Sequence, residues 1–315
     1  MRVGHNPARF VENVAQPADV TVAVVNCVPF LSGYYEQGLD VLKACITSIH
    51  ENTPEPHDLM VFDNRSCREV RQYLQEAYDQ GIIQYLVLSD RNIGKIGAWN
   101  FMFGAAQGKY VVFSDGDIGY RPGWLTASLE LFKIFPNVGM VTARPLRTPM
   151  EFSSATLDWA RQARVLEEGC FLDWETFWEH VESLGRDEAE SRKDYAAGNE
   201  YRLNYSGQTA FVGATHFQFM APREVLQKII PLPSEQPMRG ERALDAAINK
   251  MGLLRLTTDK PLVWHMGNRV SIAVEATVTP KRKSLLHWLL WLPMVRRILL
   301  WLNNQIFRLY FLNVE

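Results

Sequence analysis

The sequence has few of the residues that mark disulfide-bonded, zinc-binding or nucleic-acid-binding proteins. It contains four cysteines, and they show no CxxC or other metal-ligand spacing: Cys27, Cys45, Cys67 and Cys170. We therefore expect reduced, mostly buried thiols in a cytosolic protein. Lysine and arginine form no dominant run except near the C-terminus, and the formal net charge is −2. This charge balance argues against duplex nucleic acid as the main partner.

Targeting signals are missing from the sequence as well. Residues 1–19 contain no apolar core and no cleavage-site pattern, so we expect no signal peptide and a cytoplasmic location. The chain shows no internal repeat and no low-complexity segment. Apolar residues make up 47% of the 315 residues. This is enough for the core of one large α/β domain or of two tightly joined halves.

Short apolar runs alternate with amphipathic segments through the first half of the chain. The spacing predicts strands at 20–27, 59–62, 82–88 and 110–113, and helices at 39–49, 70–78 and 99–106. Strands that alternate with helices indicate right-handed crossovers and a largely parallel sheet. In such sheets, ligands bind beyond the carboxyl ends of the strands.

The second half has a different character. Residues 145–207 are charged and contain tryptophan, and we expect a helical insertion that lies over the sheet rather than within it. Apolar runs return at 211–220 and 253–264, and a helix is predicted between them at 241–251.

Two carboxylates at the end of the fourth predicted strand carry the strongest chemical signal. Asp115 and Asp117 flank Gly116, which is small enough to let a phosphate approach. Their position at the end of a buried strand directs both carboxylates toward the expected ligand cleft. Mg²⁺ and Mn²⁺ take oxygen ligands and can support a diphosphate leaving group. The alternative is an ordinary surface turn, since Asp and Gly are common turn residues.

Linked stretches in chain order resemble family 2 glycosyltransferases. Residues 91–100 (RNIGKIGAWN) resemble the family's N-x-G loop and A-x-N helix start. Residues 105–117 (AAQGKYVVFSDGD) resemble its A-x-G-x-Y helix exit and the strand that leads into DxD, and residues 63–66 (DNRS) resemble its D-N-G-S turn. The match covers the first half well and the rest loosely. It implies a GT-A fold, an α/β fold with a mostly parallel central sheet flanked by helices.

The resemblance also implies roles for the matching residues. Asp63 would accept a hydrogen bond from the ring N–H of uracil or guanine. Asn92 and Lys95 would face the nucleotide, with Lys95 near the diphosphate. Asp115 would contact the ribose or the metal, and Asp117 would ligate the metal. Two alternatives stay open: Asp63 caps the helix that its turn opens, and Lys95 is a solvated loop lysine.

A late histidine completes the implied metal site. Some metal-dependent GT-A enzymes have a late histidine as third metal ligand, and His265, which follows an apolar run, is similar. Neutral imidazole is a good ligand for Mn²⁺. The resemblance therefore implies Mn²⁺ or Mg²⁺ held by Asp115, Asp117 and His265. The alternative is a hydrogen-bonded histidine in the core or at the rim of the site.

The start of the predicted helix at 241–251 offers two candidates for the general base. Counted back from Gly252, residues 239–245 (RGERALD) resemble the family's E-D-x-x-L helix start, and Glu241 stands where the base is expected. It would take the proton of the acceptor hydroxyl. The usual acidic pair is reduced to one Glu here, and Asp245, one turn later on the same face, is the rival. Alternatively, Glu241 only favours the helix N-terminus electrostatically.

Together, these features predict a glycosyltransferase that moves one sugar from a UDP- or GDP-sugar to an acceptor hydroxyl. The acceptor would be a carbohydrate, a lipid-linked or another hydroxyl compound, in polysaccharide or glycoconjugate synthesis. The Q-x-x-R-W motif and the membrane spans of processive members are absent, which favours transfer of a single sugar. The resemblance favours inversion, and the late histidine keeps retention open. We expect a GT-A domain over 1–280, with a nucleotide-binding half at 20–144 and an acceptor half at 145–280.

Two rival functions stay open. A sugar-nucleotide-forming nucleotidyltransferase has a similar sheet and needs a metal, but residues 27–33 lack the Gly-rich, Arg-containing phosphate loop of such enzymes. A non-catalytic protein that binds nucleotide-sugars is compatible with the single Glu241 in place of an acidic pair.

The last residues, 281–315, form a predicted amphipathic tail. Between 284 and 312, tryptophan, leucine and phenylalanine mix with Arg296 and Arg297, and Pro293 interrupts the run, so a membrane-spanning helix is not expected. A basic, Trp-containing segment suits the inner face of a membrane, where the protein would be peripheral. The alternatives are packing on its own domain and contact with a second subunit.

Overall fold

The computed structural model describes residues 5–235, 240–270, 301–302 and 305. The compact unit that carries the fold comprises Met1–Ser271. The predicted tail and its boundary at 280 lie almost wholly outside the described residues, so both stay predictions. Among the described helices, none is both long and apolar enough to cross a bilayer.

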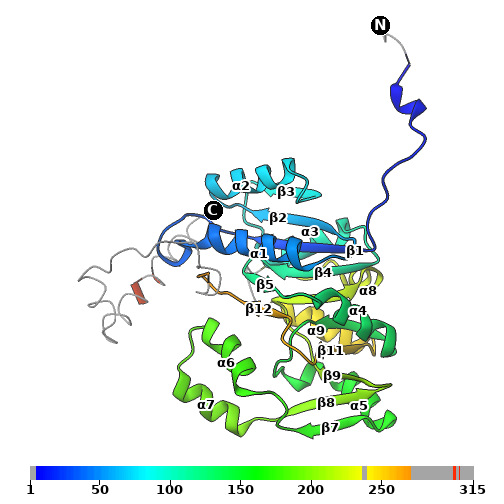
Figure 1. Ribbon diagram of the computed structural model, residues 1–315, viewed down its shortest axis with the longest axis vertical. Helices are drawn as coiled ribbons and strands as arrows, with labels where there is room; N and C mark the ends of the chain where they lie inside the picture. The colour runs from blue at the N-terminus through cyan, green and yellow to red at the C-terminus, as the bar shows by residue number, and fades with distance from the viewer. Residues whose placement is uncertain (1–4, 236–239, 271–300, 303–304, 306–315) are drawn as a thin grey trace. The chain divides into compact units, whose positions relative to one another are not determined.

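A ten-stranded sheet forms the centre of this unit (Figure 1). From one edge to the other, its strands are β3 (Tyr85–Ser89), β2 (Asp58–Asn64), β1 (Val20–Asn26), β4 (Tyr110–Asp115), β10 (Gln218–Pro222), β6 (Val138–Thr142), β11 (Leu254–Thr258), β9 (Gln208–Val212), β8 (Glu200–Tyr205) and β7 (Leu166–Gly169). Strands β3, β2, β1 and β4 are parallel to one another, and so are β6 and β11. Strand β10 runs antiparallel between β4 and β6. The predicted mostly parallel α/β sheet is confirmed.

The carboxyl ends of the first parallel strands lie level with one another. Asn26 of β1 pairs with Asp63 of β2, and Val25 pairs with Asp115 of β4. Because all these strands point the same way, their end residues meet at one edge of the sheet. This edge is where the sequence places its candidate ligand-binding residues.

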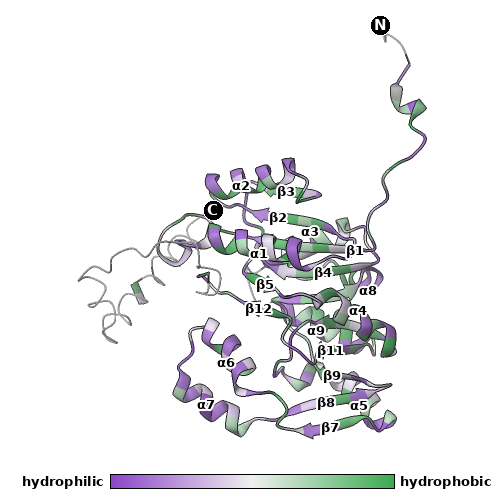
Figure 2. Ribbon diagram, in the orientation of Figure 1, coloured by the Kyte–Doolittle hydropathy of each residue, from purple (hydrophilic) through white to green (hydrophobic). Residues whose placement is uncertain are grey.

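Helices cover both faces of the sheet. On one face, α1 (Gly38–Asn52), α2 (Arg68–Asp79) and α4 (Trp124–Ile134) share a core with β1 residues Val20, Val22 and Val24. On the other face, α3 (Gly94–Ala105), α8 (Arg223–Ile229) and α9 (Glu241–Lys250) pack with Ala23 and Val25. Strand β1 is thus buried on both faces, which explains its continuous apolar run (Figure 2).

The insertion at 145–207 is partly helical and partly sheet. It contains the 3₁₀ turn η3 (Met150–Phe152) and the helices α5 (Ser154–Ala163), α6 (Trp174–Ser183) and α7 (Glu188–Ala197). It also contains β7 and β8, which extend the sheet at its edge, so the expectation that the insertion adds no strands is wrong. Leu203 of β8 is buried, whereas Arg202 pairs with Glu167 of β7 on the outer face. Charged side chains are common on edge strands, and here they masked the strand pattern.

A short two-stranded ribbon lies beside the carboxyl edge of the sheet. It pairs β5 (Ile118–Tyr120) with β12 (Val263–His265) in antiparallel register, with Trp264 opposite Gly119 and His265 opposite Ile118. A Cβ atom on Gly119 would lie 2.2 Å from the Trp264 ring, so only glycine fits there. The ribbon therefore carries His265 to the turn that holds Asp117. Two further 3₁₀ turns are η1 (Pro7–Phe10) and η2 (Gly33–Tyr35).

Candidate active site

A cavity of about 290 Å³ opens at the carboxyl edge of the sheet. Its lining includes Asn26 and Asn64 at the ends of β1 and β2, the Asp115–Asp117 turn after β4, and Lys95 in the first turn of α3. The loop before α1 contributes Tyr34 and Tyr35, and the segment after β12 contributes Gly267 and Asn268. Segments far apart in sequence thus meet around one cavity.

Asp115 and Lys95 form an ion pair in this cavity. Lys95 Nζ lies 2.7 Å from Asp115 Oδ2, and the ammonium also lies over the rings of Trp99 and Phe113. Burial raises the pKa of Asp115, and the Lys95 charge opposes this rise. Lys95 is therefore a positioned cation rather than a freely solvated loop lysine.

Asp117 faces His265 across the ribbon. His265 Nε2 lies 3.3 Å from Asp117 Oδ2, and the backbone N–H of Met266 donates to the Asp117 carbonyl at 2.8 Å. Burial lowers the pKa of His265, but its contact with the Asp117 carboxylate more than offsets this, so the pKa lies above its ordinary value.

The donor set at this turn fits a divalent cation. Asp117 Oδ1 is buried and has no hydrogen-bond partner among the described residues, which is a costly arrangement unless a ligand meets it. Carboxylate and imidazole are both suitable ligands for Mn²⁺. No group of three or more His, Cys, Asp or Glu side chains is gathered for a metal within the described part of the chain. The predicted set of three thus appears as the pair Asp117 and His265, with Asp115 turned to Lys95, and its role stays a prediction.

Gly116, between the two aspartates, sits close to the end of β1. A Cβ atom there would lie 3.1 Å from the Val25 carbonyl oxygen and 3.2 Å from Asn26 Oδ1. Such contacts are tighter than most side chains accept, so the turn needs a small residue for packing against β1 as well as for ligand approach.

The model of the family described as Glycosyl transferase family 2 matches residues 33–229, which is more than half of the chain. The chain belongs to glycosyl transferase family 2. The predicted family is therefore confirmed, and the sheet with its flanking helices is the GT-A fold of that family. No curated protein matches the chain.

Solved structures of other proteins are distantly similar to this family 2 chain. The mannosyltransferase PcManGT from Pyrobaculum calidifontis, in complex with GDP-Man and Mn²⁺, is 17% identical with a TM-score of 0.46. TarS from S. aureus is 11% identical with a TM-score of 0.45. Each comparison covers 79% of this chain, which spans 59% and 60% of the length of those two chains.

Two of the predicted nucleotide-binding residues of this family 2 protein, Asp63 and the exposed Asn92, are not part of the cavity lining. Asp63 is fully buried, and it accepts hydrogen bonds from the Ser66 backbone N–H and from Arg71. It closes its own turn and does not cap α2, whose N-cap residue is Cys67. Asn92 Oδ1 accepts from Asn64 Nδ2 at 2.9 Å and ties β2 to the start of α3. Both roles in nucleotide binding stay predictions.

The two candidates for the base occupy different environments. Glu241 is the first residue of α9 and is half-buried, and Gly240 before it packs on Ile96, the residue next to Lys95. Asp245 is buried, and both of its oxygens are engaged: Oδ1 lies 2.5 Å from Arg255 and Oδ2 lies 2.5 Å from His216 Nε2. The structure thus places Glu241 beside the start of α3 and commits Asp245 to a buried ion pair.

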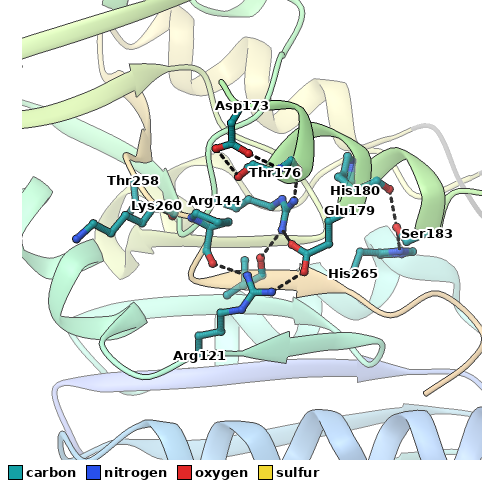
Figure 3. Close-up of polar contacts among 12 residues, drawn as sticks. Arg121, Arg144, Asp173, Thr176, Glu179, His180, Ser183, Thr258, Lys260 and His265 are labelled. Carbon is teal, nitrogen blue, oxygen red and sulfur yellow. Dashed lines mark hydrogen bonds and ion pairs between the residues drawn. The ribbon is translucent and has the colours of Figure 1, made fainter. Parts of the chain in front are cut away.

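Helix α6 of the insertion is clamped against the ribbon by charged groups (Figure 3). Glu179 accepts from Arg144 at 2.6 Å and from Arg121 at 2.5 Å. Arg144 is fully buried and also donates to the backbone carbonyls of Thr176 and Val263. Although burial raises the pKa of Glu179, the two arginines hold it below its usual value. The end of α6 is thereby fixed next to His265.

Sequence reasoning missed several residues of this site. Asn26 and Asn64 line the cavity, and their place at predicted strand ends was a usable signal. Arg255 stands inside an apolar run, which indicates a buried charge with a partner, here Asp245. Ser183, which contacts His265 through its hydroxyl, carries no signal in the sequence because the two residues meet only in the fold.

Proposed function

We propose that this protein transfers one sugar from a UDP- or GDP-sugar to the hydroxyl of a carbohydrate, lipid-linked or other acceptor. The observation that carries the proposal is the arrangement of Asp117 and Lys95. A buried carboxylate oxygen that no described residue contacts and a positioned ammonium share one cavity at the carboxyl edge of a parallel sheet. Such a combination suits a diphosphate and its cation.

Lys95 would hold the diphosphate of the donor. Its ammonium lies at the start of α3, where the backbone N–H groups and the helix dipole also favour negative charge. Asp115 keeps the ammonium in the cavity at 2.7 Å and would contact the ribose or the metal when the donor binds. Asn92 would face the nucleotide. Asp63 would recognise uracil or guanine through its carboxylate, exchanging a partner inside the turn to do so.

Asp117 and His265 would hold Mn²⁺ or Mg²⁺, with Asp115 as the third protein ligand. When bound, the cation neutralises charge that develops on the leaving diphosphate. Few protein ligands are needed, because such ions keep waters and take substrate phosphate oxygens as ligands. Asp117 contributes the buried oxygen, and His265 contributes a ring nitrogen on the same side of the turn.

Glu241 would act as the base that takes the proton of the acceptor hydroxyl. Two features support it over Asp245. Asp245 is buried and contacts Arg255 and His216 through its two carboxylate oxygens, so its carboxylate serves the fold. Glu241 lies at a helix start beside α3, on the side of the sheet that holds Lys95. We include a single displacement with inversion in the proposal, in which the acceptor hydroxyl attacks the sugar on the face opposite the diphosphate.

The other parts of the proposal concern regions outside the cavity. Residues 284–312 would contact a membrane surface at its inner face, or a second copy of the chain, and would bring the site close to a lipid-linked acceptor. The acceptor half would span 145–280. The surface contact and the acceptor half are additions to the proposed transfer, and neither of them depends on a bound metal.

A donor screen tests the proposal. Melting curves are recorded with UDP- and GDP-sugars, each with and without Mn²⁺, because a ligand that binds the native state raises the melting temperature. Donors that stabilise the protein are then assayed for release of UDP or GDP. Release of pyrophosphate from a nucleoside triphosphate and a sugar 1-phosphate would instead identify a nucleotidyltransferase. Stabilisation by a donor without any release under all conditions would identify a binding protein.

A further inference from the structure

Both ring nitrogens of His265 have partners in the structure. Nδ1 lies 3.0 Å from Ser183 Oγ at the end of α6, and Nε2 lies 3.3 Å from Asp117 Oδ2 (Figure 3 shows the contact with Ser183). Ser183 belongs to the insertion and is 82 residues away from His265 in the chain. The contact therefore links the inserted helix to the proposed metal pair.

The direction of the Ser183 hydrogen bonds follows from its second partner. Ser183 Oγ lies 2.6 Å from the backbone carbonyl oxygen of His180, and a carbonyl can only accept. A serine hydroxyl has one proton to donate. Since that proton goes to His180, Ser183 Oγ must accept from His265, and the proton of the neutral imidazole is on Nδ1.

With one proton on Nδ1, Nε2 faces Asp117 Oδ2 at 3.3 Å. A positive group between these two atoms is favourable, and a metal cation can take the place that a second proton on Nε2 occupies in its absence. The other oxygen of Asp117 is buried without a partner among the described residues. Both observations indicate that this pair is prepared for a positive ion.

We propose that Ser183 is a positioning residue that holds His265 with its proton on Nδ1, so that Nε2 is free to ligate the divalent cation. The inference rests on the proposed function and adds to it a role for the insertion. A ligating histidine commonly donates its second N–H to a fixed acceptor, which sets the tautomer and the ring orientation. Here that acceptor comes from α6, which Arg144 and Glu179 hold in place.

The alternative is that Ser183 only stabilises the end of α6 through its bond to His180. The chain offers a matched comparison on the next helix, where Ser191 Oγ donates to the Asp187 carbonyl at 2.7 Å. Ser191 is buried, and no contact joins it to the proposed metal pair. Ser191→Ala therefore removes the same local bond without touching His265.

The test measures Mn²⁺ binding to the full chain by electron paramagnetic resonance, with Mn²⁺ alone and with Mn²⁺ plus UDP or GDP. The variants are Ser183→Ala, Ser183→Thr, Ser191→Ala and His265→Gln. We expect Ser183→Ala to weaken Mn²⁺ binding roughly 10- to 100-fold. Ser183→Thr keeps the hydroxyl and should retain binding, and Ser191→Ala should bind as the unsubstituted protein does.

Pulsed measurements on the bound Mn²⁺ supply a signature that helix packing does not produce. We expect coupling to an imidazole ¹⁴N in the unsubstituted protein and in Ser191→Ala, and its loss in His265→Gln. The inference is overturned if Ser183→Ala binds Mn²⁺ unchanged, if Ser191→Ala weakens binding as much, or if bound Mn²⁺ shows no ¹⁴N coupling. An unsubstituted protein that binds no Mn²⁺ with or without nucleotide would contradict the proposed metal itself, and the inference with it.

Discussion

On one side of the cavity, Asn26, Asn64 and Asp115 are end residues of neighbouring parallel strands, and apolar cores on both faces of the sheet hold them. On the other side, His265 sits on a two-stranded ribbon whose Ile118, Tyr120 and Val263 are buried in the core, and α6 is joined to this ribbon by ionic contacts. The strand ends follow from local pattern and non-directional packing. The attachment of α6 depends on a few directional bonds between distant segments, so single substitutions should affect the strand ends and α6 differently.

The largest effect is expected at the turn where the two sides meet. Asp117→Ala should abolish transfer, with a loss of at least about 100-fold, or about 2.7 kcal/mol of transition-state stabilisation. The substitution removes Oδ1, which has no partner among the described residues, and the 3.3 Å contact of Oδ2 with His265, so the melting temperature should stay close to that of the unsubstituted protein. The measurement is release of UDP or GDP. Full activity in excess EDTA would contradict the metal role.

The second largest effect is expected at the proposed base. Glu241→Gln should lower kcat roughly 100-fold or more, while donor binding survives because the role lies with the acceptor. Donor affinity and kcat are measured separately. The comparison is Asp245→Asn, which breaks a buried pair and should destabilise the fold by about 3–5 kcal/mol. An inactive but fully stable Asp245→Asn, beside an active Glu241→Gln, would mean that Asp245 is the base.

The ionic clamp of α6 should give an intermediate effect on stability. Glu179→Gln leaves buried Arg144 without its charged partner, and we expect a loss of about 1–3 kcal/mol by denaturant unfolding. Because the folded-state pKa of Glu179 is lowered, its contribution is complete above its unfolded pKa of about 4.3 and is lost as the pH falls through the folded value. The stability difference between the two proteins should therefore shrink in acid. A stability difference that grows in acid would contradict the assignment of Glu179 as the charged partner of Arg144.

The smallest effect is expected for an exposed pair at the sheet edge. Arg202 and Glu167 join β8 to β7, and their side chains are 33% and 45% exposed. Arg202→Ala should change the free energy of unfolding by about 1 kcal/mol or less and leave activity unchanged. Melting temperatures of Arg202→Ala and the unsubstituted protein, measured over a range of salt concentrations, should differ little. A loss of unfolding free energy as large as that of Glu179→Gln would contradict the expected difference in stability between buried and exposed ion pairs.

The first half of the fold could be predicted because its signals are local. The strand expected at 20–27 is β1 (Val20–Asn26), and the helix expected at 39–49 is α1, whose buried residues recur at helical spacing. Strands β7 and β8 were missed because Glu and Arg alternate with few apolar residues there. Pairing of β7 with β8 and of β8 with β9 decided their structure, and the Ser206-Gly207 turn that joins β8 to β9 was the local signal available.

The residues of the site likewise fall into those that could be predicted from local sequence and those that could not. Asp115, Asp117 and Lys95 could be placed from a motif at a strand end, and the structure brings all three to the cavity. Asp63 is buried outside the lining of the cavity, because Asn26 of β1 and Ser66 of its own turn donate to its two carboxylate oxygens, a detail of geometry that a motif does not contain. Ser183 and the Arg144–Glu179 pair could not be found from sequence, since contacts across the fold leave no spacing to recognise.

The register of the β5–β12 ribbon has a consequence for how this protein can diversify. His265 stands opposite Ile118, beside Asp117, in a register where Trp264 packs on Gly119, and Ser183, Arg144 and Glu179 secure it from α6. The chain that follows α6, from 184 to 199, can therefore change in length or sequence while the spacing of the two side chains is kept. Recognition of new acceptors can evolve in that stretch as a separate module, under selection that leaves the two ends of the ribbon untouched.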